Sequence, residues 1–299
     1  MNQVATGAKG MFFVFEGPNG SGKTTAMRRV AELMKEAGAD VITTREPGGS
    51  VTAEKIRTLL LDPQVPMDPH EQTLLFMAAR RNHIRKVILP SIERGTIVLC
   101  DRFVASTLVY QTLRPEGGPP LSTDEVISAH GEWCWGLSPD MQFHLHLPVE
   151  VAASRRGGRA VSDDRYESDD LDYERACADR YAESGRLLGF RQHDVDADRT
   201  PEQVVAAIME VMRRVATDRL WSMMSYRVRG DRSGSWFPVM DERGSVWWTH
   251  DPNEAHRRAV EEYKRDGSAQ IRFVRRSAAV ASVDSGMTTI EVEAAGRGI

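Results

Sequence analysis

The chain has 299 residues and a formal net charge of −4, with 41% hydrophobic and 27% charged residues. This length predicts one large domain or two ordinary ones, and the small net charge excludes the overall basic excess that is typical of nucleic-acid-binding proteins. Three widely spaced cysteines predict neither a disulfide framework nor a zinc site, and the lack of a signal-peptide core or of about 18 consecutive apolar residues predicts a cytoplasmic protein without a membrane span.

The first predicted element is a buried strand at residues 11–15, which leads into the sequence GPNGSGKT between Gly17 and Thr24. This is the phosphate-binding P-loop pattern, placed between a strand and a predicted helix at 23–37. Its glycines let successive backbone N–H groups turn toward one anion, and the helix adds its positive N-terminal end. Lys23 is expected to reach the β and γ phosphates of a nucleoside triphosphate, and Thr24 to ligate Mg²⁺. The residues expected to contact the triphosphate are Gly17, Asn19, Gly20, Ser21, Gly22, Lys23, Thr24 and Thr25.

Strand and helix candidates alternate from there to residue 216. Strands are predicted at 40–44, 96–100, 141–147 and 192–195, and helices at 52–61, 71–91, 123–131, 149–156, 171–188 and 201–216. This alternation with short apolar strands predicts an α/β fold with a parallel sheet covered on both faces. Ligands then bind beyond the carboxyl ends of the strands. We therefore expect the segments after three strands, 17–24, 45–49 and 101–102, to converge on one crevice.

A second phosphate site is indicated by the sequence TREPGG, residues 44–49, in which Arg45 offers a planar fork suited to a monophosphate. An ordinary strand–helix turn with a surface arginine is the alternative. In the helix that follows, Phe76, Arg80 and His83 fall on one face. A ring to stack on a base beside an arginine to hydrogen-bond its edge suits a nucleotide, although such a stripe is more often core packing.

A third group of polar residues follows the strand at 96–100. Asp101 is placed to organise a metal ion and Arg102 to hold a phosphate, with a plain buried Asp–Arg pair as the alternative. Thr107, Tyr110 and Gln111 come one to three helical turns later and are expected near a sugar or base.

Four arginines lie in or next to a glycine-containing segment after the helix at 149–156. They are Arg155, Arg156, Arg159 and Arg165. A flap that brings positive charge over a migrating phosphoryl group and excludes water would use such residues. A solvated charged loop is the alternative, and the presence of the other phosphate sites favours the flap.

The texture changes after about residue 220, where four of the six tryptophans lie. Strands are predicted within 226–230, 235–250 and 269–276, with a hairpin turn at 241–244 and a helix from 251 to about 266. These form a small α+β accessory domain at 220–276 of unassigned role, followed by a loose tail at 277–299 in which TTIEVEA offers one more strand. Basic residues beside tryptophans suit single-stranded nucleic acid, but nearby acidic residues almost balance them, so nucleic-acid binding is not expected.

The segments FEGPNGSGKTT, TREPGG, LLFMAAR, DRFVASTLVYQ and DRYE together resemble those of thymidylate kinases, and the resemblance covers residues 10–216. It implies the three-layer fold of P-loop kinases with a parallel sheet. It also implies that the chain transfers the γ-phosphate of ATP to dTMP with Mg²⁺, giving dTDP and ADP, and that it forms a homodimer. The extension beyond residue 220 departs from the family pattern.

The resemblance assigns the base of dTMP to the helix face described above. It implies that Phe76 stacks on thymine and that Arg80 hydrogen-bonds its edge. Thr107 and Gln111 would lie near the base and sugar. It also implies a cis peptide bond between Glu46 and Pro47.

The phosphate of dTMP is assigned by the same resemblance to Arg45 and Arg102. Because this P-loop contains no arginine, the chain resembles members that use arginines of the flap described above, which is called the lid in this family. Either Arg155 or Arg159 is then expected to reach the transferring phosphate, with Arg165 in support. The expected catalytic residues are Lys23, Arg102, Arg155, Arg159 and Arg165, and the expected metal ligands are Thr24 and Asp101.

Asn19 departs from the family pattern, in which an acidic residue usually occupies this P-loop position. Asparagine keeps the shape and hydrogen bonding but lacks the charge, which affects either metal handling or the choice of acceptor. Two alternatives therefore stay open: a kinase for dUMP or a 5-modified dUMP, and a nucleotide-binding regulator without activity.

Overall fold

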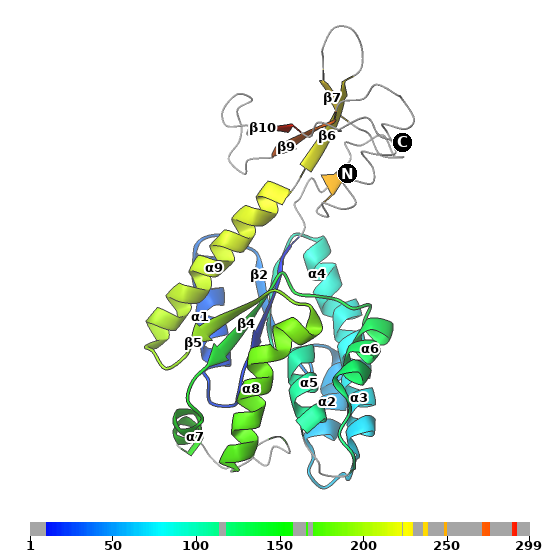
Figure 1. Ribbon diagram of the computed structural model, residues 1–299, viewed down its shortest axis with the longest axis vertical. Coiled ribbons are helices and arrows are strands. Elements are labelled where there is room, and N and C mark those ends of the chain that lie inside the picture. Colours follow the sequence, from blue (N-terminus) through cyan, green and yellow to red (C-terminus); the bar gives the residue numbers. More distant parts are fainter. Residues whose placement is uncertain are drawn as a thin grey trace, which may run out of the picture. The chain divides into compact units, whose positions relative to one another are not determined.

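The computed structural model describes residues 10–113, 118–157, 166 and 170–222, together with five short strands farther along the chain (Figure 1). The chain divides into two compact units, Met1–Val211 and Met212–Ile299. Each unit has its own sheet.

The first unit alternates strands and helices, as the sequence predicts. Its strands are β1 (Phe12–Glu16), β2 (Val41–Arg45), β3 (Ile97–Asp101), β4 (Met141–His146) and β5 (Gln192–Asp196). Its helices are α1 (Lys23–Glu36), α2 (Val51–Leu61), α3 (Pro69–His83), the π-helix η1 (Ile84–Ile88), α4 (Leu89–Glu93), α5 (Val104–Leu113), α6 (Thr123–Trp133), α7 (Val149–Gly157) and α8 (Leu171–Leu188), and α9 (Pro201–Ser222) continues past its end.

The five strands of the first unit form one parallel sheet in the order β2-β3-β1-β4-β5. Parallel strands are buried on both faces, which explains why β1 reads as an unbroken apolar run. Phe15 and Arg45 are both in register with Asp101. The segments that follow β1, β2 and β3 therefore leave the sheet side by side, which confirms the predicted α/β fold and the convergence of these three segments.

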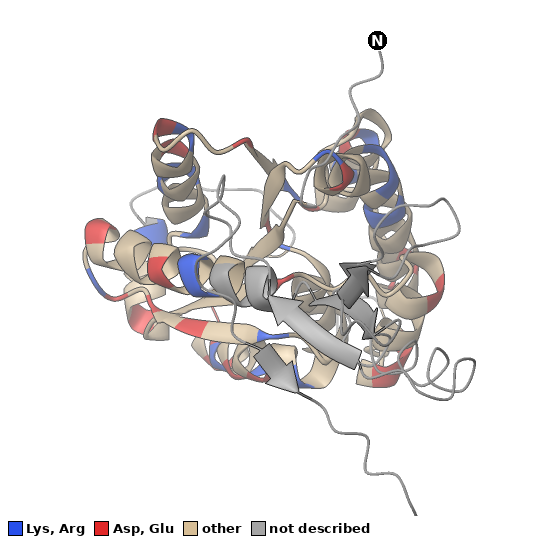
Figure 2. Cartoon of the chain, turned by 90° about the horizontal axis from the view of Figure 1, so that it is seen from above, with Lys and Arg blue, Asp and Glu red and all other residues tan. Residues whose placement is uncertain are grey.

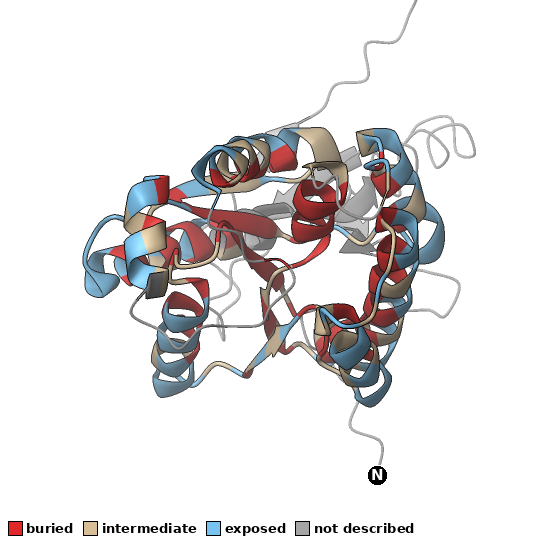
Figure 3. Cartoon of the chain, turned by 90° about the horizontal axis from the view of Figure 1, so that it is seen from below, coloured by how far each residue is buried: buried red, intermediate tan, exposed pale blue. Residues whose placement is uncertain are grey.

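Alternate residues of β1 pack on opposite faces of the sheet. Phe12 and Val14 belong to an apolar cluster that also contains Met77 of α3, Leu108 of α5 and Val126 of α6. The residues between them on β1 are equally buried, and α1 contacts β1, β2 and β3. Figure 3 shows the buried strands and inner helix faces in red and the outer helix faces in pale blue. The sheet is thus the middle layer of three.

The helical region between residues 69 and 113 differs from the sequence prediction in two places. The single helix expected at 71–91 is divided into α3, η1 and α4. Pro90 lies at the start of α4 and has no N–H to donate to the carbonyl one turn earlier, and π-helical turns occur where the regular ladder is interrupted. Helix α5 was not among the helices predicted from the sequence, although Thr107, Tyr110 and Gln111 were placed at helical turns. Its residues 104–111 are all buried, so their burial follows no helical period.

The second unit contains a five-stranded sheet in the order β10-β9-β6-β7, with β8 also paired to β6, and the pairings are antiparallel. Its strands are β6 (Met224–Arg229), β7 (Trp236–Pro238), β8 (Trp248–Thr249), β9 (Ile271–Arg275) and β10 (Thr289–Glu291). Four of them fall within the segments predicted as strands, including TTIEVEA, and β6 begins two residues before the predicted segment 226–230. The predicted turn at 241–244 and helix at 251–266 lie outside the described residues, and the accessory domain at 220–276 stays a prediction.

Charged residues of both signs are interspersed on the helices of the first unit (Figure 2). In the part of the chain that the structure describes, no helix is both long enough and apolar enough to cross a membrane.

Candidate active site

The loop between β1 and α1 has the backbone that an anion-binding P-loop needs. Gly17, Gly20 and Gly22 have φ angles of 134°, 86° and 85°, a region that side chains with a Cβ rarely enter. A Cβ on Gly17 would lie 2.4 Å from the carbonyl oxygen of Leu145, and one on Gly20 would lie 2.6 Å from that of Ala152. Close packing against β4 and α7 therefore excludes larger residues at Gly17 and Gly20.

Lys23 and Thr24, the polar residues at the end of the P-loop, border one cleft. Lys23 is buried and its Nζ donates to the carbonyl oxygen of Pro18, 2.8 Å away. The hydroxyl of Thr24 donates to Oδ2 of Asp101 in a short hydrogen bond. A hydroxyl beside a carboxylate is the all-oxygen chemistry that Mg²⁺ prefers, so Thr24 and Asp101 fit the metal-ligand pair expected from the sequence. The Oγ of Ser21 is buried and has no hydrogen-bond partner among the residues that the structure describes.

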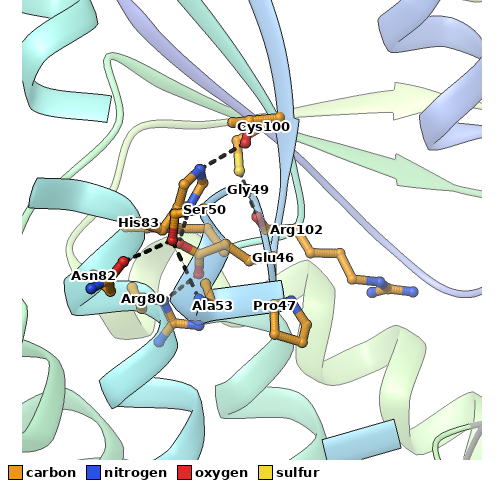
Figure 4. Close-up of polar contacts among 12 residues, drawn as sticks. Glu46, Pro47, Gly49, Ser50, Ala53, Arg80, Asn82, His83, Cys100 and Arg102 are labelled. Atoms are coloured by element: carbon orange, nitrogen blue, oxygen red, sulfur yellow. Dashed lines mark hydrogen bonds and ion pairs between the residues drawn. The ribbon is translucent and has the colours of Figure 1, made fainter. Parts of the chain in front are cut away.

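The loop after β2 is built around Glu46, which is buried and binds two side chains of α3 (Figure 4). Its Oε2 accepts from Nε of Arg80 at 2.6 Å, and its Oε1 lies 2.9 Å from Nδ1 of His83. Burial raises the pKa of Glu46, but Arg80 and His83 outweigh it and hold the pKa below its ordinary value. The Glu46–Pro47 peptide bond is cis, which confirms the expectation.

Two further arginines come from the end of β2 and the middle of α2. Arg45 is exposed and its Nη2 donates to Oε2 of Glu54 at 3.0 Å. Arg57 donates from Nη1 to the carbonyl oxygen of Pro47 at 2.9 Å. Both guanidinium groups border the P-loop cleft described below. Arg45 was expected there from the sequence, and Arg57 was not.

Arg102 stands at the centre of these segments, with an unusual backbone φ of 70°. Its Nη1 donates to Oγ of Ser106 at 2.9 Å and to the hydroxyl of Tyr181 at 2.6 Å. Its Nη2 donates to Oδ1 of Asn19 in a short hydrogen bond. A non-glycine residue with positive φ is held there by its surroundings and is a frequent feature of functional sites.

Two adjoining clefts meet at Arg102. The larger, of about 290 Å³, lies over the P-loop, and the smaller, of about 70 Å³, lies between α3 and α5. The residues that border both are Asn19, Glu46, Arg57 and Arg102. The larger cleft is also bordered by Gly20, Gly22, Lys23, Thr24, Thr25, Arg45 and Asp101. Most of the residues expected from the sequence to hold phosphates thus border one cleft.

The smaller cleft has an aromatic wall. Tyr166 lies with its ring centre 5.8 Å from that of Phe76 and 5.4 Å from that of Tyr110. Arg80 and Thr107 also line this cleft, and Nη2 of Arg80 donates to the hydroxyl of Thr107 at 2.8 Å. An apolar slot with a few fixed polar groups has the chemistry that recognises a nucleobase.

Gln111 does not line this cleft. It is buried, and its Nε2 donates to Oε1 of Gln72 at 3.2 Å, while the hydroxyl of Tyr166 donates to the same oxygen at 2.9 Å. Gln111 therefore lies in a second row behind the aromatic wall.

The lid arginines are divided by their contacts. Arg155 donates from Nη1 to the carbonyl oxygen of Ala197 at 2.9 Å. Arg156 instead binds the P-loop, donating to the carbonyl oxygen of Asn19 at 3.2 Å. Its Nη1 also lies 3.1 Å from Oε2 of Glu174 on α8. Arg159 and Arg165 lie outside the described residues.

Several residues of the site were not expected from the sequence. They are Glu16, Glu46, Arg57, Ser106, Tyr166 and Tyr181. Most are single polar residues inside apolar or helical stretches, with nothing in their local pattern to mark them. Glu46 did carry a sequence signal, because it lies in the TREPGG segment next to Arg45, which is expected to bind a phosphate.

Comparison with known proteins agrees with this geometry. The family model described as Thymidylate kinase matches residues 15–208. A thymidylate kinase of Caulobacter vibrioides is 42% identical over 208 residues, covering 68% of this chain and 96% of the relative, and one of Enterococcus faecalis is 38% identical with the same coverage. The crystal structure of thymidylate kinase from Ehrlichia chaffeensis matches with a TM-score of 0.54 and 27% identity, covering 68% of this chain and 99% of that one. The chain belongs to the thymidylate kinase family.

Proposed function

We propose that this protein transfers the γ-phosphate of ATP to dTMP, giving dTDP and ADP. The observation that carries the proposal is the junction of two clefts at Arg102: one lies over a P-loop and the other has an aromatic wall. The acceptor phosphate already carries a nucleophilic oxygen, so the protein needs only to align the two phosphates and neutralise their charge.

The donor occupies the larger cleft in this proposal. The backbone N–H groups of the P-loop and the N-terminal end of α1 hold the phosphates of ATP. Lys23 leaves Pro18, its partner at 2.8 Å, and binds the β and γ phosphates. Its positive charge is worth most where charge gathers during transfer.

The acceptor occupies the smaller cleft, with its phosphate at the junction. Phe76 stacks on the thymine, and Arg80 with Thr107 binds its edge. Arg102, Arg45 and Arg57 hold the phosphate, and all three border the cleft over the P-loop. Planar guanidinium groups suit this task because they bind phosphate oxygens in pairs.

Mg²⁺ is the metal that fits this site. Thr24 and Asp101 would hold it, because their oxygens already lie together at the edge of the P-loop cleft. When bound, the ion neutralises charge on the phosphate oxygens of ATP.

Positive charge from the lid segment completes the proposal. Arg155 or Arg159 reaches the transferring phosphate and Arg165 supports it. Arg155 lies in the last turn of α7, the helix whose Ala152 carbonyl packs against Gly20 of the P-loop, and in this proposal its side chain exchanges Ala197 for the phosphate.

A homodimer is proposed as the state of the protein in the cytoplasm. Its support is a set of exposed apolar side chains on neighbouring helices: Leu59 of α2, Leu74 of α3 and Trp133 of α6. Sedimentation analysis should give a mass of twice 33.4 kDa, and a monomer at micromolar concentration would contradict this.

The experiment is a coupled assay of ADP release by the full chain with Mg·ATP and dTMP, dUMP, dCMP, dGMP or no acceptor. We expect ADP release that depends strongly on dTMP. Turnover only with another acceptor would show that the smaller cleft and Asn19 select a nucleotide other than dTMP. Binding of ATP without acceptor-dependent turnover would contradict the kinase function.

A further inference from the structure

One amino group of Arg102 is held almost entirely by the protein. Its Nη1 has three acceptors: the hydroxyl of Tyr181 at 2.6 Å, Oγ of Ser106 at 2.9 Å and the carbonyl oxygen of Gly17 at 3.3 Å. These come from α8, α5 and the P-loop. Its Nη2 binds the side chain of Asn19, and Arg102 and Asn19 both border the two clefts. The guanidinium therefore has an anchored side and a side that faces the ligands.

The hydrogen bonds behind Arg102 have one consistent direction. Ser106 donates its single hydroxyl hydrogen to Oε2 of Glu16 at 2.7 Å. In the contact of 3.0 Å between Ser106 and Tyr181, the hydrogen must then come from Tyr181. The phenol oxygen is left to accept from Arg102. The result is a chain that runs from Arg102 through Tyr181 and Ser106 to the carboxylate of Glu16.

Glu16 fixes the far end of this chain. It is the last residue of β1, is fully buried, and also accepts from the backbone N–H groups of Phe103 and Ser106 at 2.6 and 3.3 Å. These are groups at the beginning of α5, which a carboxylate can cap. Glu16 thus holds both the hydroxyl that Tyr181 uses and the backbone immediately after Arg102.

The ring of Tyr181 is held in place on two sides. It is fully buried and stacks on His144 of β4, with ring centres 6.2 Å apart and planes 18° apart. It also meets the ring of Tyr110 edge to face at 6.3 Å. A side chain packed in this way can fix the direction of the group it binds.

We propose that Tyr181 is a positioning residue for phosphoryl transfer, which holds Nη1 of Arg102 so that the remaining edge of the guanidinium faces the acceptor phosphate. Tyr181 touches no substrate itself and acts through Arg102. The inference rests on the proposed function, because it takes Arg102 as the group that binds this phosphate. It adds the residue on α8 that sets the orientation of that group.

The test is the substitution Tyr181→Phe in the full chain, which removes the hydroxyl and keeps the ring. We expect kcat/KM for dTMP to fall roughly tenfold, as for the loss of one hydrogen bond to a charged group, with the KM for ATP changed less than about twofold. The control is Tyr173→Phe, which removes the same hydroxyl from the same helix. None of the hydrogen bonds described above for the guanidinium of Arg102 involves Tyr173, so this variant should retain the wild-type kinetics.

A double-mutant cycle separates positioning from a general structural role. In an Arg102→Lys background, the group that Tyr181 orients is already lost, so Tyr181→Phe should change kcat/KM by less than about twofold. An equal loss in both backgrounds, or wild-type kinetics of Tyr181→Phe, would overturn the proposal.

A crystal structure of the Tyr181→Phe variant gives an independent readout that needs no activity. We expect the guanidinium of Arg102 to leave the position that it has beside Ser106, and an unmoved guanidinium would overturn the positioning role. Absence of dTMP-dependent ADP release in the wild type would instead contradict the proposed function, so the two failures are distinguishable.

Discussion

Arg80 and Glu46 form a buried ion pair at the smaller cleft, which we assign to the base of dTMP. Their side chains are only 1% and 3% exposed, and Nε of Arg80 lies 2.6 Å from Oε2 of Glu46. Both residues also line the cleft. The pair therefore fixes the orientation of the Arg80 guanidinium, which we assign to the edge of the thymine ring. It joins the loop after β2 to helix α3.

Replacing Glu46 by glutamine should lower the free energy of unfolding at pH 7 by about 3 kcal/mol, because it leaves the charge of Arg80 buried without its partner. Denaturation with urea measures the change. The control is Glu54→Gln, which breaks the exposed pair with Arg45 and should cost less than about 1 kcal/mol. Equal losses in the two variants would contradict the role of burial.

The same pair predicts how stability depends on pH. The pKa of Glu46 lies below its ordinary value of 4.5 in the folded chain, because Arg80 and His83 outweigh the effect of burial. Its contribution to stability is therefore complete above pH 4.5 and is lost as the pH falls through the lower, folded value. The difference in unfolding free energy between wild type and Glu46→Gln should shrink from pH 7 to pH 4. A constant difference would show that the charge of Glu46 is not responsible.

Gly49 provides a test of the packing behind this pair. Its φ is 78°, and a Cβ would lie 2.3 Å from Nε2 of His83 and 2.4 Å from Oγ1 of Thr44, two atoms that share a hydrogen bond of 2.7 Å. Gly49→Ala should lower the free energy of unfolding by more than about 2 kcal/mol, through strain and the broken bond. Gly38 is the matched control: its φ is 83°, but a Cβ there meets no atom of the described residues within 4 Å, so its change to alanine should cost about 1 kcal/mol.

Lys23→Ala should reduce kcat by about 10²- to 10³-fold, the usual scale for the removal of one electrostatic catalytic group. The control is Lys35→Ala, which changes an exposed lysine in the last turn of the same helix and should keep kcat within about twofold. The coupled assay of ADP release measures both. Near wild-type turnover of Lys23→Ala would contradict the assignment of the P-loop as the donor site.

The sequence predicts the sheet well because its strands carry local signals. The order of apolar runs and helices places the P-loop, the loop after β2 and Asp101 at the ends of three strands, and the register of Phe15 and Arg45 with Asp101 confirms this. α5 could not be predicted, because its residues are buried on nearly all sides and therefore show no helical period.

The hydrogen bonds that hold Arg102 in place could not be predicted, for a different reason. Two partners of Arg102 lie far from it in the sequence: Asn19 is 83 residues away and Tyr181 is 79. Contacts of this kind exist only once the sheet has formed, and no local pattern records them. Glu16 illustrates the point, since it looks like the end of an apolar strand and is in fact a buried acceptor for α5.

The lid arginines yield the last prediction, because Arg155 and Arg156 are neighbours with different surroundings. Arg155 lies 3.6 Å from Asp198 in an exposed pair, whereas Arg156 and Glu174 are 12% and 9% exposed. Arg156→Ala should therefore lower the free energy of unfolding by about 2 kcal/mol, since it removes the positive charge that lies beside the nearly buried carboxylate of Glu174. Arg155→Ala should change it by less than about 1 kcal/mol.

If Arg155 neutralises the transferring phosphate, kcat should depend more on Arg155 than on Arg156, the reverse of their effects on stability. Arg155→Ala should then lower kcat about 10²-fold with little effect on the KM for ATP or dTMP, because the contact is made only in the transition state. Arg156→Ala should have the smaller effect on kcat, since Arg156 holds the carbonyl of Asn19 and not a substrate. Full activity of Arg155→Ala would transfer the catalytic role to Arg159, and the same assay on Arg159→Ala would then show the 10²-fold loss.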